Sequence, residues 1–496
     1  MNFRMIRHII GWLLLFECVF LAVPALTAVV YRERVVVYYL GAMALCGLLG
    51  WLCIRRKPPV TALYAREGFV IVAMSWILLS LMGALPLWLS REIPSFVDAL
   101  FETVSGFTTT GASILPEVER LSHAALIWRS FTHWVGGMGV LVFIMAFVPL
   151  SGGRNMHIMK AESPGPSVSK LVPRVRTTAM ILYALYMALT VIEFIFLLCG
   201  RMSVFDALNT AFSTAGTGGG GGRGGGPGGF GVRNDGMAGY SNYLQTVVTV
   251  FMLLFSINFG CYYLLLLRRI REAFNAEVRV FLLIVAAAVA VITVDLRLNG
   301  VINSVTGESF TLYGAIHHAA FTVSSLISTT GYATADFDLW PALSKTVLVG
   351  VMFLGACAGS TGGGIKVSRI LILCKSIRRE IEGLVHPHRV RRITMDRRVV
   401  DTDVIRSTNV YFVAYVLLFA VSVLLISFDD FDLVTNFTAV TASLNNVGPG
   451  LSLVGPTRNF ALFSTASKVV LIFDMLAGRL ELFPMLALLV PSTWKD

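Results

Sequence analysis

Four short segments of the chain share one arrangement of Ser, Thr, Gly and Asn residues. They run from 98 to 111, from 206 to 219, from 318 to 331 and from 435 to 448, and each ends on a glycine. In each, residues that can form a helix lead into a short extended stretch at that glycine. Main-chain carbonyl oxygens can replace the water around a cation. Four such stretches around one axis would therefore coordinate a dehydrated cation.

The glycines and the helix ends both suit this chemistry. Glycine adopts positive φ at low cost, which lets the carbonyls of the stretch face inward. The C-terminal end of each short helix carries a partial negative charge that would point at the cation. Irregular backbone at membrane depth must be buried or line a water-filled cavity. One such segment would be an ordinary re-entrant turn, but four in matched positions indicate a pore.

A further glycine-rich run lies inside an apolar stretch, from Gly355 to Gly364. Glycine at this density lowers helix propensity, so we expect the helix to open into a loop here. A nucleotide-binding phosphate loop would place lysine directly after glycine. Here Ile365 separates Gly364 from Lys366. The sequence therefore predicts no organic cofactor in this chain.

Charged residues stand inside the last apolar stretch. Asp474, Arg479 and Glu481 lie among Leu, Ala and Phe, and charges within a membrane span mark pathways or ion pairs. Arg479 is open to two interpretations, a structural pair with one of these carboxylates or a cation facing the pore. Lys468 is open in the same way. Glu102, which has no counterpart in the other three segments, is expected to form hydrogen bonds behind the first loop.

The elements that must position these residues are membrane spans. Of the 496 residues, 56% are hydrophobic and 14% are charged, whereas soluble domains carry about 25% charged residues. The apolar stretches run for roughly 18–25 residues, the length of a spanning helix, and a membrane barrel would alternate over about ten. The fold class is therefore an all-α integral membrane protein. Without a nucleophile–base arrangement, carboxylate pair or metal cluster, we expect no enzyme.

Ten long apolar stretches are candidate spans. They cover about residues 9–30, 37–54, 67–90, 124–150, 178–199, 243–267, 279–296, 343–374, 408–428 and 460–491. With a cytoplasmic N-terminus, the inward segments hold 26 of the 40 Lys and Arg residues. These segments are 1–8, 55–66, 151–176, 268–279 and 366–406. The positive-inside rule thus explains the net charge of +11 without a nucleic-acid partner.

The order of long and short segments divides the chain. Residues 1–57 form an N-terminal two-span hairpin, and four channel-like span–pore-loop–span repeats around one pore follow it. The repeats cover 58–160, 161–270, 271–385 and 386–496. The second repeat carries a Gly-rich insert at 220–229, and the third carries the broken helix. The basic run from Lys375 to Arg406 fits either anionic membrane lipid or a cytosolic docking partner.

These motifs resemble the Trk/Ktr/HKT superfamily of cation transporters over nearly the whole chain. The specific marks are TTTGAS around Gly111, STTGYAT around Gly331, NNVGPG around Gly448 and AGSTGGGIK ending at Lys366. The resemblance implies a homodimer with one monovalent-cation pore in each protomer. It also implies a cytosolic nucleotide-binding regulatory ring of the TrkA type and a multi-pass location in the bacterial cytoplasmic (inner) membrane.

The resemblance assigns roles residue by residue. The implied K⁺ selectivity filter consists of Thr109, Thr110, Gly111, Thr217, Gly218, Gly219, Thr329, Thr330, Gly331, Asn446, Val447 and Gly448. The implied gate below it consists of Gly355, Gly359, Ser360, Thr361, Gly362, Gly363, Gly364, Lys366 and Arg479. In this family, serine in the first filter is associated with Na⁺ permeation. Glycine in all four filters therefore agrees with K⁺ selectivity.

The second loop departs from the family pattern. Similar proteins continue from Thr-Gly-Gly directly into Phe-Gly, whereas here Phe230 arrives only after residues 220–229. The filter glycine is thus Gly219 or Gly229, and the spacing favours Gly219. An Arg223 facing the ions would repel them by about 1 kcal/mol at a separation of about 4 Å in water. We therefore expect the insert to bulge outward as a flexible loop.

The sequence thus predicts gated K⁺ and Rb⁺ uptake, with the ion held in the filter. The alternative is a Na⁺- or H⁺-coupled potassium symporter, because broken helices at the midplane also suit that class. Flux that follows the gradient of a second ion would favour the symporter.

Overall fold

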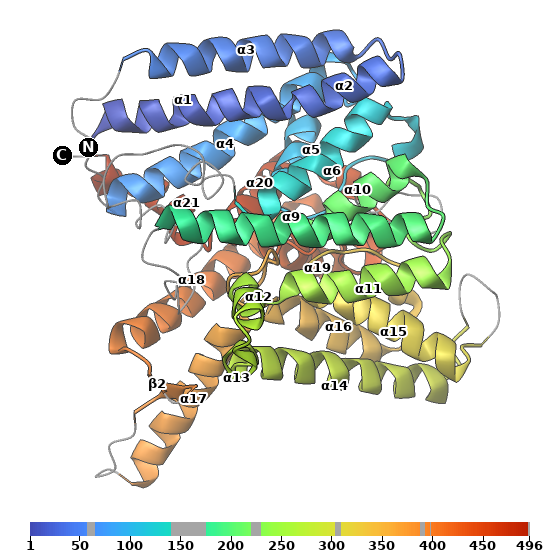
Figure 1. The fold of residues 1–496 in the computed structure, drawn as a ribbon. Coiled ribbons are helices and arrows are strands. Elements are labelled where there is room, and N and C mark those ends of the chain that lie inside the picture. The colour runs from blue at the N-terminus through green and yellow to red at the C-terminus, as the bar shows by residue number, and fades with distance from the viewer. Residues whose placement is uncertain are drawn as a thin grey trace.

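The computed structural model describes residues 1–56, 65–139, 175–219, 230–302, 309–386, 392–396 and 398–494. This part of the chain is mostly helical, with two very short strands. Several long helices run side by side, and the two termini lie at the same end of the bundle (Figure 1). The all-α membrane fold class is thereby confirmed.

Three helices form an N-terminal hairpin. Helices α1 (Phe3–Phe20) and α2 (Ala22–Val30) together make one continuous span, and α3 (Val36–Ile54) returns beside α1. The two arms approach closely at Gly11 and Gly50, because a Cβ atom on Gly50 would lie 2.9 Å from the Gly11 carbonyl oxygen. Small residues at such crossings let membrane helices pack through their backbones.

After the hairpin, a long helix, a short helix and a second helix follow one another four times. The long helices are α4 (Ala65–Leu89), α9 (Val175–Cys199), α14 (Ala276–Leu298) and α18 (Thr402–Ile426). The short helices are α5 (Phe96–Phe107), α10 (Val204–Ala215), α15 (Leu312–Ile327) and α19 (Leu433–Leu444). The second helices are α6 (His123–Gly137), α11 (Asn242–Ser256), α16 (Ala342–Leu354) and α20 (Thr465–Arg479).

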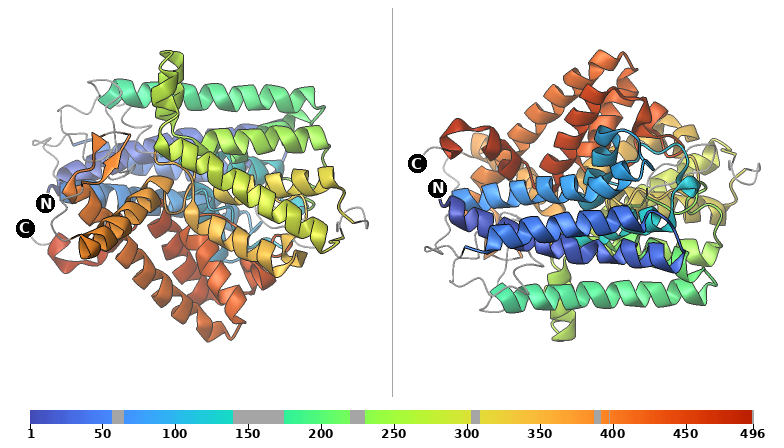
Figure 2. Two further views of the ribbon diagram at one scale, coloured as in Figure 1. Left: turned by 90° about the horizontal axis from the view of Figure 1, so that it is seen from below. Right: turned by 90° about the horizontal axis from the view of Figure 1, so that it is seen from above.

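The remaining elements complete the described chain. They are α12 (Phe259–Leu266), α13 (Ile270–Ala273), α17 (Val367–Val385), α21 (Phe483–Leu489), strands β1 (Thr394–Met395) and β2 (Arg398–Val399), and 3-10 turns at Val118–Arg120, Phe337–Leu339, Ser427–Asp429, Ser452–Val454, Phe460–Leu462 and Pro491–Thr493. The two strands pair antiparallel within the basic run. Seen from above and below, the C-terminal helices form a lobe on one side of the bundle, opposite α9 (Figure 2).

The start of each short helix is encoded locally. The preceding residue has extended backbone and a side-chain oxygen that accepts a hydrogen bond from an N–H of the first turn. These N-caps are Ser95, Ser203, Thr311 and Asp432. Such caps satisfy donors that a helix start leaves without partners, so all four short helices begin at a defined residue.

The ten expected spans are not all continuous. Within the described residues, six helices are long and apolar enough to cross a membrane, or seven if the bent pair α11–α12 counts as one span. The span predicted at 243–267 is wrong as a straight helix, because α11 and α12 meet at 91°. Asn258 caps the new helix by accepting from the Gly260 N–H at 2.7 Å, which stabilises the break.

Two other expected spans are interrupted, and one is described only in part. The predicted opening of 343–374 is present, between the end of α16 and the start of α17. The span predicted at 460–491 is wrong as one helix, because Glu481 and Leu482 adopt φ values of 54° and 69° between α20 and α21. The span predicted at 124–150 begins as α6, and residues 140–174 lie outside the described part.

Candidate functional site

The four glycine segments follow the short helices at one spacing. Each short helix ends four residues before its glycine. We call the resulting buried stretches glycine loops 1 to 4, covering 108–111, 216–219, 328–331 and 445–448. The C-terminal ends of α5, α10, α15 and α19 therefore all lead into these loops, with their partial negative charge at the loop side.

All four helix ends carry the same cap. The residue just before each glycine donates its N–H to the carbonyl five positions back, at 2.8–2.9 Å. The four donors are Thr110, Gly218, Thr330 and Val447. The residue before each donor is left-handed, with φ of 59° at Thr109, 53° at Thr217, 62° at Thr329 and 55° at Asn446. This is a Schellman cap, in which glycine or asparagine is the usual left-handed residue.

Sequence reasoning included these four residues in the filter but did not predict their left-handed backbone. Threonine is β-branched, so positive φ is strained there and costs on the order of 1–3 kcal/mol. Such strain persists where surrounding structure over-determines it, as happens at functional sites. The expected glycines are left-handed in three loops, with φ of 81° at Gly111, 81° at Gly331 and 99° at Gly448. Gly219 is not among the positive-φ residues, so loop 2 differs from the expected pattern.

The four loops contact one another in a closed ring. A Cβ atom on Gly111 would lie 2.7 Å from the Gly219 carbonyl oxygen, which joins loop 1 to loop 2. The Gly219 N–H donates to the Thr330 carbonyl of loop 3. In the same way, a Cβ atom on Gly331 would lie 2.5 Å from the Val447 oxygen of loop 4, and one on Gly448 would lie 2.8 Å from the Thr110 oxygen of loop 1. Segments that lie more than a hundred residues apart in sequence are thus brought together in a closed ring.

The ring is rich in carbonyl oxygens that have no hydrogen-bond donor. Within the described part of the chain, no hydrogen bond ends on the main-chain oxygens of Thr109, Thr110, Gly111, Thr217, Gly218, Thr329, Gly331, Asn446, Val447 or Gly448. Buried carbonyls almost always have a partner. An oxygen-binding ligand such as a bare cation would supply one.

The loop between α16 and α17, residues 355–366, packs against this ring, and we call it the α16–α17 loop. Its Gly363 N–H donates to the Thr329 hydroxyl at 2.8 Å, and its Thr361 carbonyl accepts from the Thr217 hydroxyl at 3.2 Å. Lys366 is buried and donates to the Gly362 carbonyl of the same loop. The α16–α17 loop therefore contacts glycine loops 2 and 3 through side chains, and it comes against loop 4 at Gly363.

Arg479 connects the α16–α17 loop to the first repeat. Its guanidinium donates to the Thr361 carbonyl at 2.9 Å, to the Gly137 carbonyl at 2.8 Å and to the Gly136 carbonyl. Glu481, one of the carboxylates considered for Arg479, pairs with Arg369 of α17. The described geometry therefore places Arg479 at the α16–α17 loop, as a donor to main-chain oxygens.

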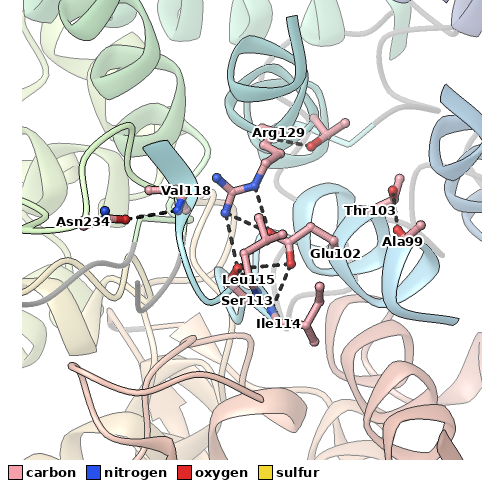
Figure 3. Close-up of polar contacts among 10 residues, drawn as sticks. Ala99, Glu102, Thr103, Ser113, Ile114, Leu115, Val118, Arg129 and Asn234 are labelled. Carbon is pink, nitrogen blue, oxygen red and sulfur yellow. Dashed lines mark hydrogen bonds and ion pairs between the residues drawn. The ribbon is translucent and has the colours of Figure 1, made fainter. Parts of the chain in front are cut away.

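The other charged candidates make ion pairs or hydrogen bonds with residues outside the glycine loops. Lys468, which the sequence left open, pairs with Asp98 of α5 at 2.6 Å. Asp474 accepts from the Ser422 hydroxyl at 2.7 Å. Glu102 accepts from Ser113, Ile114 and Arg129, so its expected hydrogen-bonding role is present (Figure 3). Among the described residues, no group of three or more His, Cys, Asp or Glu side chains could hold a metal ion.

The ring contacts bear on which glycine belongs to loop 2. Gly219 touches loops 1 and 3, and its carbonyl accepts from the Phe230 N–H at 3.0 Å. The two ends of the insert are therefore already joined, while residues 220–229 themselves lie outside the described part. This geometry favours Gly219 over Gly229 as the ring residue.

Deleting residues 220–229 is expected to leave cation flux and ion preference within about twofold of the starting protein, because closing a loop between ends already in contact costs little. Flux into liposomes from K⁺ and Na⁺ gradients measures both. Gly219→Ala is the comparison variant, since its Cβ would meet the Tyr332 ring at 2.5 Å. A deletion that abolishes flux would contradict the assignment of Gly219.

The fold and the site together define a multi-pass helical membrane protein with a buried, oxygen-rich centre. Residues 33–495 match the family model of the TrkH cation transport proteins. The chain is 35% identical to the Trk system potassium uptake protein TrkH of Salmonella typhimurium and to that of Escherichia coli, with 100% of each chain covered. A crystal structure of the potassium transporter TrkH from Vibrio parahaemolyticus aligns with a TM-score of 0.86 at 32% identity, covering 100% of both chains. The chain therefore belongs to the TrkH family of cation transport proteins, and it is a transporter rather than an enzyme.

Proposed function

We propose that this protein takes up K⁺ through a pore lined by the four glycine loops. The closed ring of loops with unpartnered carbonyl oxygens is the observation that carries the proposal. These oxygens would replace the hydration shell of K⁺ or Rb⁺, and the four short helices would add their negative ends. The names of the similar proteins, potassium uptake proteins, support K⁺ as the transported ion.

The residues of the proposed filter are the last three of each glycine loop. They are Thr109, Thr110, Gly111, Thr217, Gly218, Gly219, Thr329, Thr330, Gly331, Asn446, Val447 and Gly448. The ion bound there is cargo, and no organic cofactor takes part in this proposal.

The α16–α17 loop is the proposed gate. It packs directly on the ring through the Thr217 and Thr329 side chains, so an ion leaving the ring would have to pass it. Gly355, Gly359 and Gly364 have φ of 54°, 75° and 70°. Because glycine has no Cβ atom, it can adopt this and other backbone conformations at low cost, which suits a loop that must move. Lys366 and Arg479 add positive charge at this level, which opposes a cation until the loop moves.

The proposal also covers the membrane location of the protein, its assembly and its regulation. The basic excess on one side favours a cytoplasmic N-terminus, with the protein in the inner membrane of a bacterium. Two copies form a homodimer, and a cytosolic nucleotide-binding ring of the TrkA type controls the gate. The relatives are named as parts of a Trk system, which agrees with such additional components.

Purified protein in liposomes is expected to pass K⁺ and Rb⁺ down their own gradients, with Na⁺ and Li⁺ at least about tenfold slower, a difference of about 1.4 kcal/mol. No proton or sodium gradient should be required, because a carbonyl-lined path conducts without a coupled ion. Tracer uptake with each gradient imposed separately is the measurement. Flux that appears only with a second ion's gradient would replace the channel with the symporter. If nothing moves until a cytosolic ring is added, the pore stands and the ring dominates the gate.

A further inference from the structure

A buried ion pair holds the end of glycine loop 1 (Figure 3). Arg129 of α6 donates from Nε to Glu102 Oε1 of α5 at 2.8 Å, and its Nη2 lies 2.8 Å from the same oxygen. Both side chains are at most 1% exposed. The Glu102 carboxylate also accepts from the Ser113 hydroxyl at 3.0 Å and from the Ile114 N–H at 3.1 Å. Because Ser113 and Ile114 closely follow Gly111, the pair fixes the chain as it leaves loop 1.

The same arginine also faces the end of glycine loop 2. Its guanidinium carbon lies 4.3 Å from the centre of the Phe230 ring, a distance at which a desolvated cation and an aromatic face attract each other. Phe230 in turn donates its N–H to the Gly219 carbonyl at 3.0 Å. A planar guanidinium can bind a carboxylate along its edge and stack on a ring with its face. One side chain therefore contacts the supports of both loops.

His133, one helical turn after Arg129, completes the support of loop 2. Its ring meets the Phe230 ring edge-on with centroids 4.1 Å apart. The imidazole also fills the space beside Gly218, where a Cβ atom would overlap it. Since Gly111 and Gly219 lie against each other within the ring of loops, a shift of Phe230 would reach loop 1 as well as loop 2.

We infer that Arg129 is a positioning residue that sets the spacing of glycine loops 1 and 2, acting through Glu102 and Phe230, and so determines how well the pore rejects Na⁺. The inference rests on the proposed pore function. Carbonyl rings distinguish K⁺ from Na⁺ through the size or the field of the oxygen cage, and both depend on where the loops stand. Arg129 itself contacts no ion in this scheme.

Two conservative substitutions test whether Arg129 positions the glycine loops. Phe230→Leu removes the aromatic face and keeps the ion pair, whereas Arg129→Lys keeps the positive charge and loses the planar fork. In liposomes, each is expected to lower the ratio of K⁺ to Na⁺ flux by about tenfold, the effect of losing one desolvated contact of this kind, while K⁺ flux persists. Size-exclusion profiles and melting temperatures show whether each variant is folded. If one variant does not fold, the other still tests the inference.

Asp98→Asn is the matched control. It breaks the Asp98–Lys468 pair, which also joins α5 to another helix but does not contact the glycine loops. It is expected to lower the melting temperature and leave the flux ratio unchanged, because any electrostatic effect at that site acts equally on K⁺ and Na⁺. If the parent protein selects K⁺ and the folded Phe230→Leu and Arg129→Lys variants keep its flux ratio, the inference is overturned and the proposed function stands. An equal loss of selectivity in Asp98→Asn would overturn the inference too. A parent protein without K⁺ flux would overturn the proposed function and the inference with it.

Discussion

Replacing Gly331 by alanine is expected to lower the ratio of K⁺ to Na⁺ flux by at least about tenfold. At φ of 81° an L-residue is strained, by about 1–2 kcal/mol. The new methyl group would also stand 2.5 Å from the Val447 carbonyl oxygen and 2.8 Å from Pro449 Cδ. Loops 3 and 4 must then separate, which moves oxygens of the proposed filter. A distortion worth about 1.4 kcal/mol changes an equilibrium tenfold.

Gly350→Ala is the control for this substitution. Gly350 lies in α16 of the same repeat, and a Cβ atom there would meet nothing within 4 Å. Alanine also favours a helix by about 1 kcal/mol over glycine, so this variant should fold at least as well and keep the parent flux ratio. The measurement is paired uptake of K⁺ and Na⁺ into liposomes at equal protein content. A Gly331→Ala protein that still rejects Na⁺ would contradict a filter at glycine loop 3.

Local signals made the glycine loops predictable from the sequence. Ser95 and Ser203 are N-caps that start two of the short helices, and the glycines mark where the chain leaves the helices. The segments that end on these glycines recur at one spacing in the sequence, and this repetition located all four loops. The caps also act over a few residues, but the prediction did not use them. The opening at Gly355 could be predicted for the same reason, because glycine lowers helix propensity wherever it stands.

Long-range contacts were beyond the same reasoning. Lys468 pairs with Asp98, which is 370 residues away. Glu481 pairs with Arg369, which is 112 residues away. Patterns that extend over a few residues of the sequence cannot predict either pair. The left-handed backbone of Thr329 runs against the backbone preference of a β-branched residue. Its hydroxyl accepts from the Gly363 N–H of the α16–α17 loop, a contact that no local pattern predicts. The break at Asn258 was hidden because two isolated polar residues, Ser256 and Asn258, still leave the surrounding run apolar enough to look like one continuous span.

Replacing Arg479 by alanine is expected to raise K⁺ flux at least about fivefold, without changing the preference for K⁺. The guanidinium is a positive charge at the proposed gate. A unit charge about 4 Å from a passing cation raises its energy by about 1 kcal/mol in water and about 4 kcal/mol at a dielectric constant of 20. The same group donates to the Thr361 carbonyl of the α16–α17 loop and to the Gly137 carbonyl of the first repeat. Its loss therefore removes both a barrier and a contact that holds the loop.

Arg479→Lys separates these two contributions, because it keeps the charge but loses the fork that reaches several carbonyls at once. If the charge alone were the barrier, the lysine variant would conduct like the parent. We expect it to conduct more than the parent and less than Arg479→Ala, since the hydrogen bonds to the α16–α17 loop also restrain it. Arg297→Ala is the matched control, because Arg297 likewise donates to a main-chain oxygen, that of Phe310 at 2.7 Å, outside the glycine loops and the α16–α17 loop. The initial rate of Rb⁺ uptake into liposomes without a regulatory partner compares all four proteins. Equal K⁺ flux in Arg479→Ala and the parent would contradict a role of Arg479 in the gate.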